Sequence, residues 1–191
     1  GWNAETHRMV CDVCGHVMET DTQAPILEVL EDGKSYTAED TKNGTPGAYT
    51  FSVSDPTKAD ETSSGVKSVT INGEEQAGPA YQLPAPDGGN NDAGNKYTVV
   101  ATDNAGNATT ATVTVYRRHR VKVISPDGET TYAERELAHN EYLVLTMKMP
   151  DGAAVKLTDQ ADGTEISYDA TTGSFMIGLI DRSRTFVLEY E

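Results

Sequence analysis

Alternation of apolar and polar residues with a period of two runs through most of the chain after Ala24 and constrains its fold more than any other feature. In residues 49–54, Tyr49, Phe51 and Val53 fall on one face of the pattern, and hydroxyl-bearing side chains fall on the other. Successive side chains of a β-strand point to opposite faces of the sheet, so the pattern predicts strands that are each buried on one side. Such strands are expected at residues 25–30, 49–54, 67–71, 97–102, 111–115, 121–124, 142–147, 154–157, 175–180 and 185–190.

Turn-forming residues separate the expected strands. Asn72-Gly73 is the strongest short signal for a hairpin, because both residue types tolerate a left-handed backbone. The sequence Asp-Asn-Ala-Gly-Asn at 103–107 provides a comparable loop between two expected strands. Residues 133–138 are the one candidate helix, which is too short to be stable alone. Pro-Asp-Gly turns are expected at Pro86, Pro126 and Pro150. Short strands at this spacing predict an all-β fold made of β-sandwiches.

The charge of the chain narrows its range of partners. Lys and Arg number 15 against 30 Asp and Glu, which gives a formal net charge of −15 over 191 residues. An acidic surface repels phosphate backbones and anionic lipid headgroups, so we expect no nucleic acid partner and no membrane-surface partner. No apolar run approaches the roughly 20 residues of a membrane-spanning helix, so no membrane insertion is expected within this chain. We expect a monomer.

The two ends of the sequence favour a piece of a longer exported protein over a cytosolic one. Residues 1–5 are neither basic nor followed by an apolar core, so they do not form a signal peptide. The chain stops at Tyr190-Glu191, directly after an apolar strand. Cys11 and Cys14 are its only cysteines, so no disulfide framework is expected and packing alone must hold the domains together.

Three stretches of the first half resemble the bacterial Ig-like domains of cell-surface proteins. They are the hairpin 97–115 with its Asp-Asn-Ala-Gly-Asn loop, the pair of segments 53–55 and 64–69, and the entry segment 21–25. The resemblance implies one Ig-like sandwich over residues 23–117 that serves as a spacer, a stalk or an adhesion module. It also implies that Tyr97 is a tyrosine-corner residue and that Val99 stands where an antibody domain has its second cysteine. No disulfide between the sheets is therefore expected.

The second half, residues 118–191, resembles the β-repeats that follow such domains in surface proteins of Gram-positive anaerobes. The likeness rests on the strand 140–146 and on the closing segments that run from Gly173 to Tyr190. It implies a second, smaller Ig-like sandwich and assigns no functional residue. The boundary is expected at the basic cluster 117–120, which we interpret as a solvated linker beside acidic neighbours rather than as an anion-binding patch.

Residues 1–22 hold the most chemically suggestive motif, a knuckle-like Cys/His segment. The Cys-x-x-Cys-Gly sequence is typical of a zinc knuckle, in which a tight turn lets backbone amides point at two thiolates. The segment also resembles the Trp/His/Cys-x-x-Cys-Gly repeats of exported proteins of anaerobic Firmicutes. We predict a structural zinc site, and the four candidate ligands are His7, Cys11, Cys14 and His16.

Other roles for this segment stay open. The missing ligands could come from another part of the full-length protein, or from His119 or His139. The two cysteines could also form a local disulfide, act as a redox pair, or have no special role. A zinc-dependent hydrolase is not expected, because no helix places a glutamate beside these ligands.

Neither catalysis nor calcium binding is favoured by the remaining motifs. The sequence has no Gly-x-Ser-x-Gly elbow, no phosphate-binding loop and no His-Glu-x-x-His helix, so an enzyme is not expected. Asp55, Asp60, Asp103 and the loop 87–95 offer the hard oxygen ligands that Ca²⁺ prefers. Neither an EF-hand nor a β-roll spacing fits them, however, and turn formation explains these residues without a metal. We therefore do not expect calcium.

The expected function is that of a non-catalytic, extracellular or surface-attached modular protein whose domains act as spacers or in adhesion. A host or cell-wall glycan or a protein is the expected kind of partner. The alternative is a carbohydrate-binding region of a larger enzyme that acts on polysaccharides. Exposed aromatic side chains that converge on one surface would favour the alternative.

Overall fold

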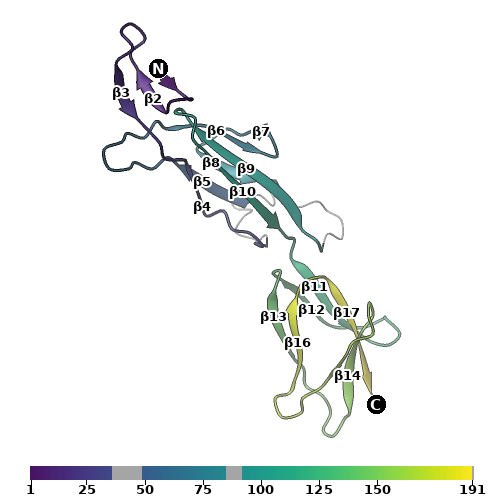
Figure 1. The fold of residues 1–191 in the computed structure, drawn as a ribbon. Helices are drawn as coiled ribbons and strands as arrows, with labels where there is room; N and C mark the ends of the chain where they lie inside the picture. The colour runs from purple at the N-terminus through teal and green to yellow at the C-terminus, as the bar shows by residue number, and fades with distance from the viewer. Residues whose placement is uncertain (36–48, 85–91, 191) are drawn as a thin grey trace. The chain divides into compact units, whose positions relative to one another are not determined.

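The computed structural model describes residues 1–35, 49–84 and 92–190, and these residues form strands, turns and loops but no helix (Figure 1). The described residues divide into two compact units. The first contains residues 1–33, 49–84 and 95–115, and the second contains 34–35, 92–94 and 116–190. No helix among the described residues is long and apolar enough to cross a membrane. The all-β class expected from the alternating pattern is therefore confirmed.

The first unit begins with a small antiparallel sheet made from the Cys/His segment. Its strands are β1 (Trp2–Asn3), β2 (Arg8–Val10) and β3 (Val17–Thr20), in that order. His7, the residue directly before β2, has a left-handed backbone with φ of 53°. This sheet groups with the residues that follow it rather than forming a unit of its own.

Two further sheets of the first unit enclose its core. One has the order β10-β9-β6-β7, with β10 at Ala108–Val115, β9 at Asn95–Asp103, β6 at Val66–Ile71 and β7 at Glu74–Glu75. The other has the order β4-β5-β8, with β4 at Ile26–Glu28, β5 at Tyr49–Ser54 and β8 at Ala80–Leu83. Buried residues alternate with more exposed ones in β5, β6, β8, β9 and β10, and the rings of Phe51 and Tyr81 stack with centroids 5.6 Å apart.

The second unit is a β-sandwich-like pair of sheets with its own core. The larger sheet has the order β12-β11-β17-β14-β15, and the strands are β11 (His119–Ile124), β12 (Thr131–Leu137), β14 (Val155–Asp159), β15 (Glu165–Ser167) and β17 (Arg184–Tyr190). The smaller sheet pairs β13 (Glu141–Thr146) with β16 (Ser174–Ile180). Side chains of both sheets, including Val123, Leu145, Phe175 and Phe186, form one hydrophobic cluster. The first and last strands of the unit, β11 and β17, lie side by side and run parallel.

The expected strands from 49–54 onward are present with ends shifted by a few residues at most, and the Asn72-Gly73 hairpin is present between β6 and β7. The short helix expected at 133–138 is wrong. Residues 133–137 belong to β12, which pairs antiparallel with β11 and places Leu137 opposite His119 in the buried layer. Six residues cannot form a stable helix alone, so hydrogen bonding to β11 decides their conformation. The turn expected at Pro86 lies outside the described residues.

Candidate metal centres

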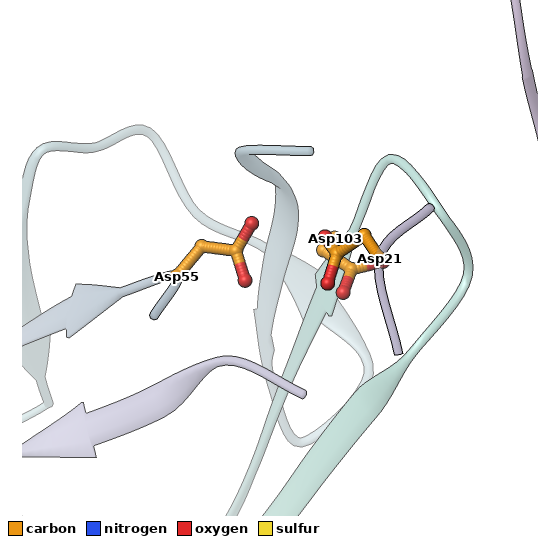
Figure 2. A group of neighbouring side chains, drawn as sticks. All are labelled: Asp21, Asp55 and Asp103. Carbon is orange, nitrogen blue, oxygen red and sulfur yellow. The ribbon is translucent and has the colours of Figure 1, made fainter. Parts of the chain in front are cut away.

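Three aspartates from three separate segments of the first unit meet beside the Asp-Asn-Ala-Gly-Asn loop. Asp21 follows β3, Asp55 follows β5 and Asp103 ends β9. Each offers one carboxylate oxygen, and these three oxygens lie within 4.8 Å of one another. Figure 2 shows the carboxylate of Asp55 extending toward Asp21 and Asp103. Carboxylate oxygens are the kind of ligand that a hard cation such as Ca²⁺ prefers.

The loop 103–107 holds Asp103 and Asp21 in place through Asn107. The backbone amide of Asn107 donates to Asp103 Oδ1 over 2.8 Å, and its side-chain amide donates to Asp103 Oδ2 over 2.8 Å. The same side-chain amide donates to the backbone carbonyl of Asp21 over 3.1 Å. Asn104 donates to the carbonyls of Ser64 and Gly65, so the loop is also tied to the segment that approaches Asp55.

Backbone and hydroxyl donors orient the other two carboxylates. Asp21 accepts from the amides of Gln23 and Ser64 over 3.1 and 2.7 Å. Asp55 Oδ2 accepts from the Ser63 hydroxyl over 2.7 Å and from the Gly65 amide over 2.6 Å. Asp55 Oδ1 accepts nothing, and it is the one buried side-chain oxygen or nitrogen of the described residues without a partner.

Two of the three aspartates are buried, and no cationic side chain of the described residues pairs with any of the three. Asp21 is 1% exposed and Asp103 is 0% exposed, whereas Asp55 is partly buried. Within the part of the chain that the structure describes, no ion pair involves any of the three. Buried charges in proteins are normally paired or coordinate a metal.

Comparisons with known proteins add no relative. No family model, no curated protein and no solved structure matches the chain. The function must therefore be argued from the sites themselves.

The Cys/His segment forms a tight turn around Cys11. The Gly15 amide donates to the Cys11 carbonyl and the Cys11 amide donates to the His16 carbonyl, both over 2.9 Å. Hydrogen bonds from the backbone amides of Cys14 and Val13 lower the pKa of the Cys11 thiol, and a hydrogen bond with the Cys14 side chain adds to this effect. Amides that point at a sulfur stabilise its thiolate form, which is the form that binds metal.

The four predicted zinc ligands are not brought together as a set of three or more among the described residues. The His7 ring places Nδ1 3.0 Å from the Ala105 carbonyl, so His7 contacts the 103–107 loop. His16 and Cys14 are exposed, and Cys11 is partly buried. His7 therefore makes a contact that its spacing from the cysteines did not predict, and the zinc site stays a prediction.

The two other histidines lie together in the second unit. His119 is 2% exposed, with Nε2 3.1 Å from His139 Nδ1 and Nδ1 3.3 Å from Asp92 Oδ1. The His139 ring stacks on the Tyr116 ring with centroids 3.6 Å apart. Burial lowers the pKa of His119, and the Asp92 charge opposes that shift. Hydrogen bonding and stacking account for both rings.

The sequence singled out two of the three clustered aspartates and missed the third. Residue type and loop position predict Asp55 and Asp103 as oxygen donors, but they equally predict Asp60, which is exposed and outside the group. Asp21 has a place in the sequence pattern only as part of the entry segment 21–25. A spacing rule cannot find this group, because its members come together only when β3, β5 and β9 end at the same place.

Proposed function

We propose that the chain is a non-catalytic part of an extracellular or surface-attached protein, in which two tandem Ig-like sandwiches act as spacer or adhesion modules. The division into two all-β units carries this proposal, because each unit has sheets with one buried face and a core of its own. Modules of this kind fold independently of their neighbours and can be joined in series.

The Asp-Asn-Ala-Gly-Asn loop supports the Ig-like interpretation of the first unit. It joins β9 to β10, which are hydrogen-bonded in the uninterrupted register from Asn95↔Val115 to Thr102↔Ala108. Tyr97 is buried and donates from its hydroxyl to the Pro84 carbonyl over 2.9 Å. A tyrosine corner likewise bonds to backbone upstream of the tyrosine.

The positions of the exposed tyrosines favour a spacer or adhesion module over a carbohydrate-binding region. Tyr132, Tyr142 and Tyr190 are the exposed aromatic residues among those described. Tyr132 and Tyr142 belong to different sheets. Tyr190 points to the same face of β17 as the core residues Phe186 and Leu188. These three rings do not share one face of a sheet, as a platform for a sugar would require.

An outward apolar face supports the adhesion role. Tyr142 pairs with Leu179 and Val144 pairs with Met176 across β13 and β16, and all four side chains are exposed. Contiguous apolar side chains on a surface are typical of protein-binding sites. The expected partner is therefore a protein with an apolar surface.

A hollow of the surface beside β5 and β8 is lined by Val29, Thr50, Phe51, Ser52, Pro79 and Ala80. None of these side chains titrates near neutral pH, so this hollow offers no general acid or base.

For the Cys/His segment we propose a structural zinc knuckle, supported by the amide hydrogen bonds to Cys11.

Arrays of glycans and extracellular-matrix proteins, probed with the full chain, test this function. The spacer or adhesion role predicts no saturable glycan binding. Any protein binding should be lost with Met176→Ser and retained with the control Tyr132→Ala, because Tyr132 lies outside the outward apolar face. Saturable glycan binding that Tyr142→Ala abolishes would overturn the proposal in favour of the carbohydrate-binding alternative.

A further inference from the structure

We propose that Asp21, Asp55 and Asp103 form a calcium-binding site in the first unit. The proposal goes beyond the spacer or adhesion role, which does not require a metal. It rests on the mutual distance of three carboxylate oxygens, on the burial of Asp21 and Asp103 without a counter-charge, and on one buried oxygen of Asp55 that lacks a partner.

Two carboxylates of the group are buried with no positive charge from the described residues to compensate them. Asp21 and Asp103 are almost wholly removed from solvent, and an oxygen of Asp55 lies within 4.8 Å of an oxygen of each. Carboxylates at this separation repel one another whenever they are ionised together, and the repulsion is strongest at low effective dielectric. No Lys, Arg or His nitrogen of the described residues lies within 4.0 Å of them. A divalent cation bound between them removes both the repulsion and the cost of burying unpaired charge.

One carboxylate oxygen of Asp55 lacks a hydrogen-bond partner. Its Oδ2 accepts two hydrogen bonds, from Ser63 and Gly65, and these fix the carboxylate plane. Its Oδ1 is buried and accepts none. Buried polar atoms in native proteins have partners in the great majority of cases, counting water and ions. The carboxylate of Asp55 extends toward the other two aspartates (Figure 2), so a cation there would supply the missing partner.

The ligand atoms of the group are all carboxylate oxygens. All three side chains offer carboxylate oxygen and none offers nitrogen or sulfur, which selects a hard cation over zinc. The ligands come from loops and strand ends that do not impose the near-ideal octahedron that Mg²⁺ needs. Ca²⁺ accepts irregular sets of six to eight oxygens and can complete its shell with water. Extracellular calcium modules work at dissociation constants of about 10⁻⁴–10⁻³ M, so a weak site is sufficient.

A cation at this position would join parts of the chain that are distant in sequence. Asp21 connects the small N-terminal sheet to β4, Asp55 follows β5, and Asp103 opens the Asp-Asn-Ala-Gly-Asn loop. Binding should therefore hold the N-terminal sheet and both core sheets of the first unit together. Because folding forms the site, bound calcium stabilises the folded unit by mass action.

Calorimetric titration of CaCl₂ into the chelator-treated full chain tests the site, with thermal unfolding in chelator and in calcium as the second measurement. The wild-type chain should bind saturably at one site and unfold at a higher temperature in calcium. Loss of a hydrogen-bonded neighbour of a metal ligand already weakens metal binding about 10–100-fold, so Asp55→Asn should weaken it by about 100-fold or more. In chelator this variant should be at least as stable as the wild type, because it loses one of three repelling charges and keeps an oxygen for Ser63 and Gly65.

Asp60→Asn is the matched control. Asp60 is exposed, lies outside the group, and has a left-handed backbone with φ of 67°, which asparagine tolerates. The Asp60→Asn variant should bind calcium as the wild type does. The proposal is overturned if millimolar calcium gives neither heat nor a shift in unfolding, if Asp55→Asn and Asp60→Asn respond alike, or if Mg²⁺ binds as tightly as Ca²⁺. None of these results would alter the binding-array test of the spacer or adhesion role.

Discussion

A Cβ atom placed on Gly106 would lie 2.7 Å from the Cβ of Ala4 and 2.9 Å from its Cα, so the two residues touch with no room for a side chain on the glycine. Gly106 also has a left-handed backbone, with φ of 89°. Glycine in the Asp-Asn-Ala-Gly-Asn loop is thus required twice, by its own conformation and by the approach of the N-terminal sheet.

Gly106→Ala should destabilise the first unit and loosen residues 1–20. The left-handed backbone alone costs about 1–3 kcal/mol with a side chain, and the clash with Ala4 adds to this cost. Gly73→Ala is the control, because Gly73 has φ of 87° but no neighbour within 4 Å of its added Cβ. Urea unfolding and limited proteolysis measure the effects. Equal losses in the two variants would show that the Ala4 contact does not matter.

Burial of His119 should make the second unit less stable in mild acid. Its pKa is lowered in the folded state, so below about pH 6.5 the unfolded chain takes up a proton that the folded chain resists. Stability should therefore be complete above that pH and fall as the pH drops toward the folded pKa. Denaturant unfolding at pH 7.5 and 5.5 measures the change. His119→Gln should reduce the difference between the two pH values, whereas His16→Gln, at an exposed position, should not.

The buried ion pair of the second unit should be costly to break from one side. Arg184 Nε lies 2.6 Å from Asp159 Oδ2, and the Asp159 side chain is wholly buried. Arg184→Leu leaves that carboxylate unpaired and should cost about 3–5 kcal/mol of unfolding free energy. Arg182→Leu breaks an exposed pair with Asp162 and should cost far less, because solvent screens exposed pairs. Adding Asp159→Asn to Arg184→Leu should recover part of the lost stability. A double-mutant cycle that found no interaction energy between Arg184 and Asp159 would contradict the pairing.

The lowered pKa of Cys11 predicts unequal reactivity of the two thiols. In metal-free chain at neutral pH, Cys11 should be alkylated faster than Cys14, because more of it is thiolate. Zinc should protect both thiols if the knuckle binds metal, and Cys11→Ser should abolish protection of Cys14. Mass spectrometry of iodoacetamide-treated chain measures both effects. Alkylation that zinc leaves unchanged would count against the zinc prediction.

Local pattern was enough to find the strands whose burial alternates, and β5 begins and ends at the residues expected for it, Tyr49–Ser54. It failed for β12, because the Ala-Glu-Arg-Glu-Leu segment has good helix formers and only its pairing with β11 makes it a strand. The short strand β8 was missed, although Tyr81 and Leu83 alternate with Gln82 between them. Four residues are too few for the alternation to stand out.

The candidate calcium site could be predicted from the sequence only in part, because its residues are far apart along the chain. Asp55 and Asp103 could be named as oxygen donors from their residue type and loop position. Asp21 could not be added to them, because that requires knowing that the end of β3 meets the ends of β5 and β9. The contact between His7 and Ala105 is likewise set by the docking of the N-terminal sheet, which no local motif reports.

The parallel pairing of β11 with β17 has a mechanical consequence for the second unit. The start of β11 and the end of β17 are the two ends of the strand-forming stretch of this unit, and Val121–Ile124 pair with Arg184–Val187. A pull on those two ends draws the neighbouring strands past each other along their length. Their hydrogen bonds are then loaded in shear, all at once, rather than unzipped one after another. We therefore expect the unit to resist extension between these two ends more strongly than an unzipping arrangement of the same hydrogen bonds would.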